Sequence, residues 1–392
     1  MTNETIAALR STYETKCADL AIDPSPAALK LFDNQSRDGE QTELILCGSC
    51  KELFNNRLDG MQICALAESL LDDTHIVHLD LSYNFMDDSG AQSIAHLLKI
   101  NKTLKCINLA GNDITAVGAK TLSTILTVPA GYDGSNAVEM ISLNGNPIGD
   151  DGAIAVAEML KQNTNLKLVD LGNTGMAAKG IISICCALAE NRSNVEVLSL
   201  ERPLLKGPQD VVANHLANML ASNCKLKNLN LAQFGMVDAE FETIVATGLT
   251  KNSSICELDL HGNRLSGFSG PTLERMLKEC QNIESLNLAA NQLGSSGATA
   301  LAECVPYSTL LRFLDVRNNR IGEPGLIALA NALHVSANLS IFFVWGNSFG
   351  PISCETFMTL LERFQQDDRP LVIDIEPYEV DGEVKVALVD VE

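Results

Sequence analysis

The chain has 392 residues, of which 46% are hydrophobic, and its 28 lysines and arginines against 49 aspartates and glutamates give a formal net charge of −21. This hydrophobic content argues against a disordered chain, and the negative charge argues against direct binding to a nucleic acid. No apolar run reaches the roughly 18 to 20 residues that a transmembrane helix needs, so no membrane contact is expected. Residues 1–5 lack the features of a secretory signal, so the twelve cysteines are expected to be reduced thiols in a cytoplasmic protein.

Residues 1–43 are expected to form a helical N-terminal cap. Apolar side chains recur at helical spacing within residues 3–20, at Ile6, Leu9, Tyr13, Cys17 and Leu20. Ser25 and Pro26 are typical of the N-cap and first position of a helix, so a second short helix is predicted after them.

A phrase of eleven positions then recurs, with apolar residues at positions 1, 4, 6 and 11 and usually Asn at position 9. One clear copy is Leu104-Lys-Cys-Ile107-Asn-Leu109-Ala-Gly-Asn112-Asp-Ile114. Ten copies, 28 to 34 residues apart, begin at Ile76, Leu104, Val138, Leu166, Val195, Leu226, Ile255, Ile283, Leu311 and Leu339. Such regularity is the signature of a repeat architecture.

Each part of the phrase has a physical role. Its alternating apolar positions predict a short strand with one buried face, and the Asn amide can satisfy backbone groups in the turn that follows. A glycine and an amphipathic stretch come next, as in residues 152–160, and predict a helix. Since one such unit cannot bury its apolar face alone, we expect an α/β solenoid, a curved horseshoe with parallel strands on the concave face and helices on the convex face. Residues 44–366 would hold about eleven units, the first of them divergent.

These residues resemble the leucine-rich repeats of the ribonuclease-inhibitor-like subfamily, whose signature LxxLxLxxNxL is followed by a full helix. The resemblance covers more than four-fifths of the chain. It implies the fold but no single function, because ribonuclease inhibitor, the Ran GTPase-activating protein, sensors of NOD-like receptors and several cytoskeletal and ciliary proteins share it. The long acidic tail of the Ran GTPase-activating family has no counterpart in residues 384–392.

Two stretches depart from the repeat. Three consecutive copies within residues 166–250 replace the Asn by Thr174, Pro203 and Phe234, and one adds a proline-bounded loop at residues 201–208. Inserted loops often carry function, but neutral drift in the middle of the array is the favoured explanation. A second insertion, residues 129–136 with Tyr132, is interpreted as a surface connector.

Odd positions of the phrase should face the concave side, because successive side chains of a strand alternate. The column between the strand leucines is polar and mildly acidic until Phe343. Bulkier groups beside it are the candidate partner-binding residues: Tyr83, Glu201, Arg202, His261, Phe313, Arg317, Phe343 and Trp345. Aromatic and arginine side chains dominate interface hot spots. The alternative is that the C-terminal segment covers Phe343 and Trp345 as part of a cap.

Residues 367–392 are expected to form that C-terminal segment. Residues 371–376 predict a final strand, and Asp381-Gly382 is a turn signal that leads into a second strand at 384–389. A capping hairpin is the favoured interpretation, and a tail that binds a partner by strand addition is the alternative.

No catalytic, cofactor-binding or metal-binding residue is predicted. The six histidines lack zinc-ligand spacing, Cys47 and Cys50 form a lone CxxC that favours structural thiols, and no phosphate-binding or nucleophile motif is present. The strand aspartates recur at the same position of several repeats, which favours a solvated row over a catalytic pair.

The sequence therefore predicts a non-enzymatic adaptor, scaffold or regulator that binds a protein partner on its concave face. The net charge favours a partner with a basic surface. Two alternatives stay open: a GTPase-activating or ribonuclease-inhibitor-like regulator of a partner enzyme, and a fixed component of a ciliary or cytoskeletal assembly.

Overall fold

The computed structural model describes residues 3–35, 42–127, 136–207, 209–280, 282–367 and 369–390. Except for Asn136, the insertion expected at 129–136, with Tyr132, lies outside these residues, as does Pro208 of the second loop. The chain divides into two compact units, Met1–Leu204 and Leu205–Glu392. None of the helices in the described ranges is both long and apolar enough to cross a membrane.

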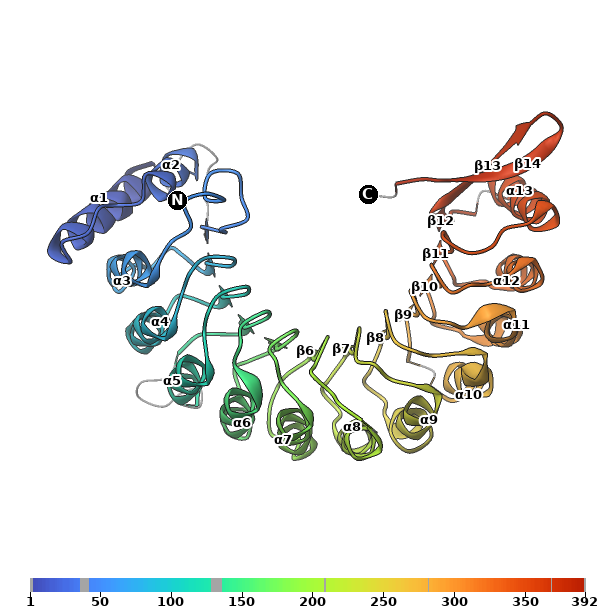
Figure 1. The fold of residues 1–392 in the computed structure, drawn as a ribbon, viewed down its shortest axis with the longest axis horizontal. Helices are drawn as coiled ribbons and strands as arrows, with labels where there is room; N and C mark the ends of the chain where they lie inside the picture. Colours follow the sequence, from blue (N-terminus) through green and yellow to red (C-terminus); the bar gives the residue numbers. More distant parts are fainter. Residues whose placement is uncertain are drawn as a thin grey trace. The chain divides into compact units, whose positions relative to one another are not determined.

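Unit 1 begins with two helices and continues as alternating strands and helices. Its helices are α1 (Asn3–Asp19), α2 (Pro26–Gln35), α3 (Gly60–Ser69), α4 (Asp88–Ile100), α5 (Ala116–Leu126), α6 (Gly149–Leu160) and α7 (Ala178–Ala189). Its strands are β1 (Glu43–Ile45), β2 (His78–Asp80), β3 (Cys106–Asn108), β4 (Met140–Ser142), β5 (Leu168–Asp170) and β6 (Val197–Ser199). The strands line the concave side of the unit and α3–α7 its convex side (Figure 1).

The two N-terminal helices form where their apolar spacing and capping residues predict them. Pro26 is the first residue of α2, and the Ser25 hydroxyl accepts a hydrogen bond from the Ala28 N–H at 3.3 Å. The rings of Tyr13 and Phe32 are both buried and lie 5.7 Å apart between centroids, so α1 and α2 share an aromatic core.

The strands of unit 1 are parallel and pair each residue with its equivalent in the next repeat. Leu79 pairs with Ile107, which pairs with Ile141, and all three are buried in the core. The residues on either side of them are exposed or half-buried and face the concave side. The predicted period of two is therefore confirmed.

The repeated asparagine links consecutive repeats, as Asn112 illustrates. Its Nδ2 donates to the carbonyls of Leu109 and of Leu81 in the preceding repeat, at 2.9 and 3.0 Å, and its Oδ1 accepts from the Met86 N–H at 3.0 Å. The predicted role of this amide, which is to satisfy backbone groups in a buried turn, is confirmed and extended across repeats.

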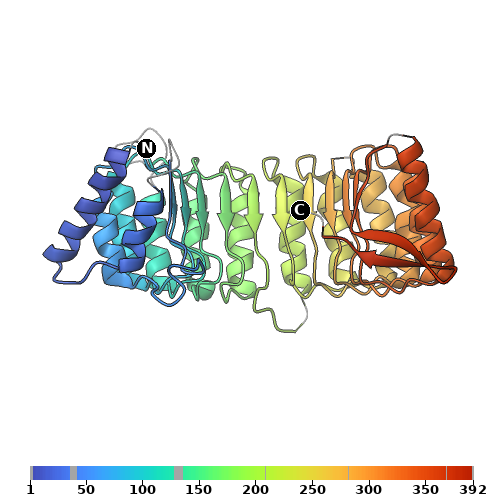
Figure 2. The same cartoon turned by 90° about the horizontal axis from the view of Figure 1, so that it is seen from above.

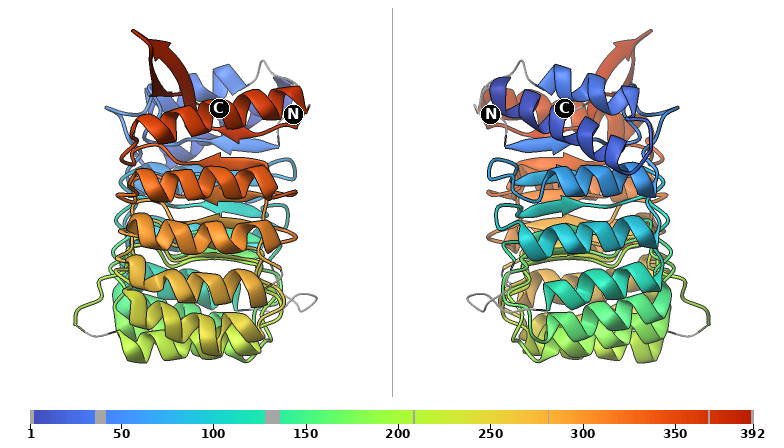
Figure 3. Two further views of the ribbon diagram at one scale, coloured as in Figure 1. Left: turned by 90° about the vertical axis from the view of Figure 1, so that its right-hand side faces the viewer. Right: turned by 90° about the vertical axis from the view of Figure 1, so that its left-hand side faces the viewer.

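Helices pack closely because glycine recurs in their first turn. A Cβ at Gly180 of α7 would lie 2.8 Å from the Ala153 Cβ of α6 and 2.8 Å from an oxygen of Asp150. Figure 3 shows the resulting stacks of helices, with those of unit 1 in blue to green on the right and those of unit 2 in yellow to red on the left.

Unit 2 continues the same pattern. Its helices are α8 (Asp210–Ser222), α9 (Asp238–Thr247), α10 (Gly270–Glu279), α11 (Gly294–Cys304), α12 (Glu323–Val335) and α13 (Pro351–Gln366). Its parallel strands are β7 (Asn228–Asn230), β8 (Glu257–Asp259), β9 (Ser285–Asn287), β10 (Phe313–Asp315), β11 (Ile341–Phe343) and β12 (Val372–Ile373). Within each unit the strands lie side by side in front of the helices (Figure 2).

The end of unit 2 differs in one respect from expectation. The single strand predicted for 371–376 is interrupted at Asp374, between β12 and β13 (Ile375–Val380). A hairpin then forms from β13 and β14 (Glu383–Leu388), and its turn residues Asp381 and Gly382 both have positive φ, 54° and 77°. The hairpin packs against α13. The domain boundaries expected at 43 and 366 stay predictions.

Candidate partner-binding surfaces

Four of the predicted residues, Phe313, Arg317, Phe343 and Trp345, lie on β10 and β11 or within two residues of their ends, on the concave side of unit 2. Arg317 donates from Nη2 to Asp315 at 2.6 Å and from Nε to the two oxygens of the same carboxylate at 2.9 and 3.1 Å. The Asp315 side chain is only 1% exposed, whereas that of Arg317 is 40% exposed. These hydrogen bonds raise the pKa of the guanidinium still further, so Arg317 is a fixed positive charge in this row of aspartates.

Two aromatic rings complete this cluster. Phe313 and Phe343 meet edge to face with their centroids 5.5 Å apart, and the Arg317 guanidinium carbon lies 4.8 Å from the centroid of Phe343. Both rings are half-buried. Phe343 thus contacts both Phe313 and Arg317, and we call these three residues with Asp315 the β10–β11 cluster.

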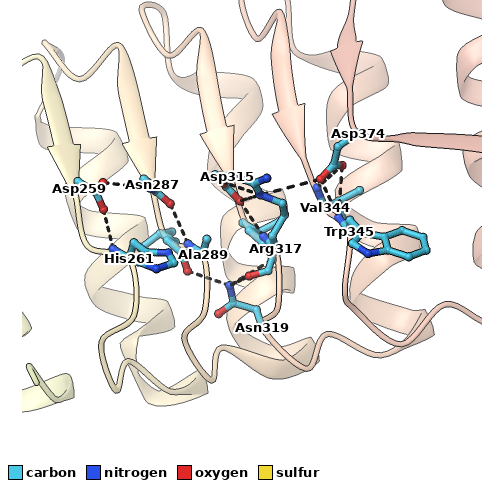
Figure 4. A network of polar contacts seen from close by, with 12 residues as sticks. Asp259, His261, Asn287, Ala289, Asp315, Arg317, Asn319, Val344, Trp345 and Asp374 are labelled. Carbon is cyan, nitrogen blue, oxygen red and sulfur yellow. Dashed lines mark hydrogen bonds and ion pairs between the residues drawn. The ribbon is translucent and has the colours of Figure 1, made fainter. Parts of the chain in front are cut away.

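Trp345 lies beside the β10–β11 cluster without joining it. Its indole points away from the Arg317 guanidinium (Figure 4), and its side chain is half-buried. Its backbone N–H and that of Val344 donate to the carboxylate of Asp374, the latter at 2.8 Å. Burial raises the pKa of Asp374. Neither Phe343 nor Trp345 is fully buried, so the two predictions for them, partner contact or cap, both stand.

His261 lies two repeats before the β10–β11 cluster, at the same position of the phrase as Arg317. Its N–H donates to Asp259 at 2.7 Å, and the side-chain amide of Asn287 donates to the other oxygen of that carboxylate at 3.1 Å (Figure 4). Burial raises the pKa of Asp259. A row of hydrogen-bonded polar groups therefore leads along the concave strands of unit 2.

A second surface lies on unit 1, where the strands line a shallow hollow of about 440 Å³. One side of it is apolar, with Cys106, Met140 and Leu168. The rest of its lining includes polar and charged side chains and the ring of Tyr83: His78, Tyr83, Asn108, Ser142, Asn144, Asp170 and Glu201. Of the predicted residues, Tyr83 and Glu201 both line this hollow, and we call it the unit 1 hollow.

Tyr83 and Arg202 share an unusual backbone conformation. They occupy the eighth position of their repeats with φ of 58° and 49°, where other repeats have glycine, as at Gly111 and Gly145. The Tyr83 ring lies against Gly111, since a Cβ there would be 2.5 Å from a ring carbon. Arg202 begins the exposed loop and is outside the lining of the hollow.

The metal-ligating side chains and the thiols of the described residues can be assessed from their surroundings. Nowhere in the described ranges do three or more His, Cys, Asp or Glu side chains converge as a metal site. Burial raises the pKa values of Cys280 and Cys304 to about 12, so these thiols are protonated and unreactive at neutral pH. Cys47 and Cys50 are unpaired, and the Cys47 sulfur contacts the Ser82 hydroxyl at 3.3 Å.

Two features of these surfaces were missed from the sequence. Asp374 is one, because an aspartate within an apolar run gives no signal that its side chain accepts backbone N–H groups. The apolar row of Cys106, Met140 and Leu168 is the other. It could have been found by comparing the third position of successive phrases, where unit 2 has the polar residues Asn228, Glu257 and Ser285.

Comparison with known proteins agrees with this architecture. A family model described as Leucine Rich repeat matches residues 72–95, 101–123, 139–157, 279–302 and 307–330. Mouse NACHT, LRR and PYD domains-containing protein 14 is 25% identical over 263 residues, which cover 66% of this chain and 24% of that protein.

Two further relatives are named as a centrosomal protein and as a phosphatase regulatory subunit. Mouse Centrosomal protein of 78 kDa is 28% identical over 39% of this chain and 22% of that protein. The Protein phosphatase 1 regulatory subunit 37 homolog of Caenorhabditis briggsae is 24% identical over 70% of this chain and 29% of that protein. The chain thus spans less than a third of the length of each of these three relatives. The five segments that match the Leucine Rich repeat model fall on the repeating strand, turn and helix, so the chain contains leucine-rich repeats.

Proposed function

We propose that the chain is a non-catalytic adaptor or regulator that holds a protein partner against its concave strands. The observation that carries this proposal is the β10–β11 cluster. Its arginine is held in place by a buried aspartate and by an aromatic ring before any partner arrives. A prearranged surface loses little conformational entropy on docking, and arginine and aromatic side chains are the usual anchors of an interface.

A chemical crosslinking pull-down from cell lysate tests this proposal. We expect partners captured by the wild type to be lost from Phe313→Ala/Trp345→Ala. The matched control is Phe268→Ala/Tyr307→Ala, which removes two aromatic side chains of unit 2 that are 88% and 71% exposed. Capture of the same partners in equal amounts by both variants would contradict the proposal. If the first variant melts below the wild type, Phe313→Leu takes its place because it keeps apolar volume in the cluster.

The proposed partner has a basic surface, since the chain carries a formal charge of −21. Association with such a partner should weaken as salt is raised from about 0.05 to 0.5 M, because exposed charges are screened over shorter distances. Titration of the purified partner at several salt concentrations measures this dependence. An affinity that does not change with salt would exclude the electrostatic part of the proposal.

A second candidate is regulation of a partner enzyme, GTPase-activating or ribonuclease-inhibitor-like in kind, and the similarity to a phosphatase regulatory subunit favours a regulatory role. It is tested by assaying the captured partner with and without added chain. Similarity to a centrosomal protein favours a fixed place in a cytoskeletal or ciliary assembly, which predicts recovery in the insoluble fraction of a lysate. We also propose a cytoplasmic location, in which the twelve cysteines would be kept as thiols.

A further inference from the structure

We propose that the unit 1 hollow binds an extended segment of a protein partner in which aliphatic and basic side chains alternate. This inference rests on the proposed function and adds to it a second site, separate from the β10–β11 cluster, and the chemistry of its occupant.

The apolar side of the hollow is a continuous row. Cys106, Met140 and Leu168 are the first residues of β3, β4 and β5, and the parallel pairing places each directly beside the next. The sulfur atoms of Cys106 and Met140 are 3.4 Å apart, and Met140 is 37% exposed. Val197 of β6 extends the row and is half-buried. Such a row on an open strand face is stabilised when aliphatic side chains cover it.

The other side of the hollow is acidic, and its Asp170 accepts hydrogen bonds from neutral donors. Asp170 accepts from the Ser142 hydroxyl at 2.9 Å, from the Gly172 N–H at 3.0 Å and from the Asn144 amide at 3.2 Å. The same amide donates to Glu201 at 3.2 Å, so two carboxylates share one donor group. Within the described part of the chain, no lysine or arginine forms an ion pair with Asp170.

The β10–β11 cluster shows what a cation does at this place in the repeat. Asp170 and Asp315 hold the same position of the phrase, and the residue two places later is Gly172 in one repeat and Arg317 in the other. A side chain cannot be accommodated at Gly172 without a shift, because its Cβ would lie 2.4 Å from the Glu201 Cγ. Unit 1 therefore has the aspartate without its arginine, and a partner can supply the missing cation.

The spacing of the two sides fits an extended segment that crosses the strands. From β2 to β6 there are four strand spacings, about 19 Å, which an extended chain covers with about six residues. Its side chains alternate between the two sides, so one set meets the apolar row and the other meets Asp170 and Glu201. Tyr83 stands at the β2 end, with 49% of its side chain exposed, and offers a ring face to a guanidinium.

Fluorescence anisotropy with a labelled peptide, acetyl-GLRLRLRG-amide, tests the inference on the full-length protein. We expect the wild type to bind it, and Asp170→Asn/Glu201→Gln to bind about tenfold more weakly. The matched control is Asp151→Asn/Glu158→Gln, which removes two exposed carboxylates from the convex side of unit 1 and should change the affinity less than about twofold. Equal weakening by both variants would mean that net charge alone attracts the peptide, and would overturn the inference.

Peptide variants test the two sides separately. GSRSRSRG lacks the aliphatic side chains and GLQLQLQG lacks the charges, and each should bind at least about tenfold more weakly than the parent peptide. Met140→Gln, which leaves all charges in place, should weaken binding of the parent peptide and leave that of GSRSRSRG unchanged. Binding of GSRSRSRG as strong as that of the parent would contradict a role for the apolar row.

Failure of this inference is distinguishable from failure of the proposed function. The inference fails and the proposed function stands if capture of partners requires Phe313 and Trp345 while the affinity for the peptide is unchanged by substitution of Asp170 and Glu201. Sedimentation without peptide addresses another occupant. A dimer of the wild type that dissociates in Asp170→Asn/Glu201→Gln would show that a second copy of the chain fills the hollow, and would also overturn the inference.

Discussion

Backbone strain marks two of the candidate residues. The eighth position of the phrase has positive φ in all ten repeats of the array, and four repeats place glycine there: Gly111, Gly145, Gly262 and Gly346. Other residues adopt this conformation at a cost of about 1 to 2 kcal/mol. Tyr83 and Arg202 keep large side chains in spite of it, which is the pattern expected where a side chain is retained for binding.

The variant Arg202→Gly tests whether this strain is stored. We expect it to raise the free energy of unfolding by about 0.5 to 1 kcal/mol. Glycine relieves the left-handed strain of the folded state, and this gain exceeds the loss of stability from the larger conformational entropy of the unfolded chain. Arg192→Gly is the control, since Arg192 is exposed but does not have positive φ, and it should be neutral or destabilising. Urea unfolding measures both, and a destabilised Arg202→Gly would contradict the assignment of strain.

Two aspartates should respond to pH in opposite directions. Burial raises the pKa of Asp374 above its ordinary value of 3.8, so the folded state holds this proton more tightly and loses stability as pH rises through the raised pKa. Hydrogen bonds from Ser89 and from the N–H of Gly90 lower the pKa of Asp87, so its contribution is present at neutral pH and is lost on acidification.

Substitution by asparagine separates these contributions. Relative to the wild type, Asp374→Asn should gain stability as pH rises from about 4 to 7, whereas Asp87→Asn should lose stability as pH rises from about 2 to 5. Urea unfolding at several pH values measures both differences. Curves that run parallel to the wild type for both variants would show that neither carboxyl titrates differently on folding.

At the scale of elements, some helices are capped by the preceding repeat. Helix α7 has Ala177 at its N-cap, which carries no hydrogen-bonding side chain. Asp150 of the preceding repeat takes over this role and accepts from the N–H groups of Ala177 and Gly180, each at 2.8 Å. The carboxylate also lies at the positive end of the helix dipole of α7. One side chain thus stabilises a helix and ties it to its neighbour.

The variant Asp150→Ala should therefore lower the free energy of unfolding by about 1 to 2 kcal/mol, the effect of losing an N-cap. Asp151→Ala is the matched control, because Asp151 is exposed and its only described ionic contact is with Lys179 at 3.9 Å; it should change stability by less than about 0.5 kcal/mol. Chemical denaturation compares the two variants. Equal effects would argue that Asp150 has no capping role.

The elements themselves were largely predictable from the sequence. Strands fall where the phrase alternates, and the hairpin turn is at the predicted Asp381-Gly382, because these features depend on local spacing and turn chemistry. The break at Asp374 and the apolar row from Cys106 to Leu168 were not predicted. Both depend on which groups become neighbours after stacking: N–H groups of the preceding repeat in one case, and equivalent residues of adjacent strands in the other.

At the scale of the whole molecule, the two compact units meet in sequence at Leu204 and Leu205, within the segment that lacks the asparagine. Asn146 donates to carbonyls of its own repeat and of the preceding one, Leu143 and Leu109. Thr174 donates only to Leu171 of its own repeat, at 2.8 Å. In a stacked array each repeat is stabilised by its neighbours, so loss of these links weakens coupling where the repeats are irregular. Whether residues 166–250 also serve binding stays a prediction.

The last repeat of the array is not followed by another complete repeat. Two truncations test which C-terminal residues cover its exposed end. A chain ending after Asp374 keeps β12 and the carboxylate that accepts from Val344 and Trp345, so it should retain cooperative melting. A chain ending after Leu371 loses both and should melt earlier or aggregate, because exposed terminal repeats need a cap. If both truncations melt like the full chain, β12 and Asp374 are not a cap. If both are destabilised, the hairpin itself is required.

The pairing of strands without stagger has a consequence for how recognition can change over time. In each unit, the repeat number and the position in the phrase together determine where a side chain lies on the concave face. Each side chain lies beside the residue at the same position of the next repeat. Along each strand, these concave side chains alternate with the leucines of the core. A single substitution on the concave face can therefore alter one contact with a partner while the fold stays intact. Binding specificity can evolve through substitution of one concave residue at a time.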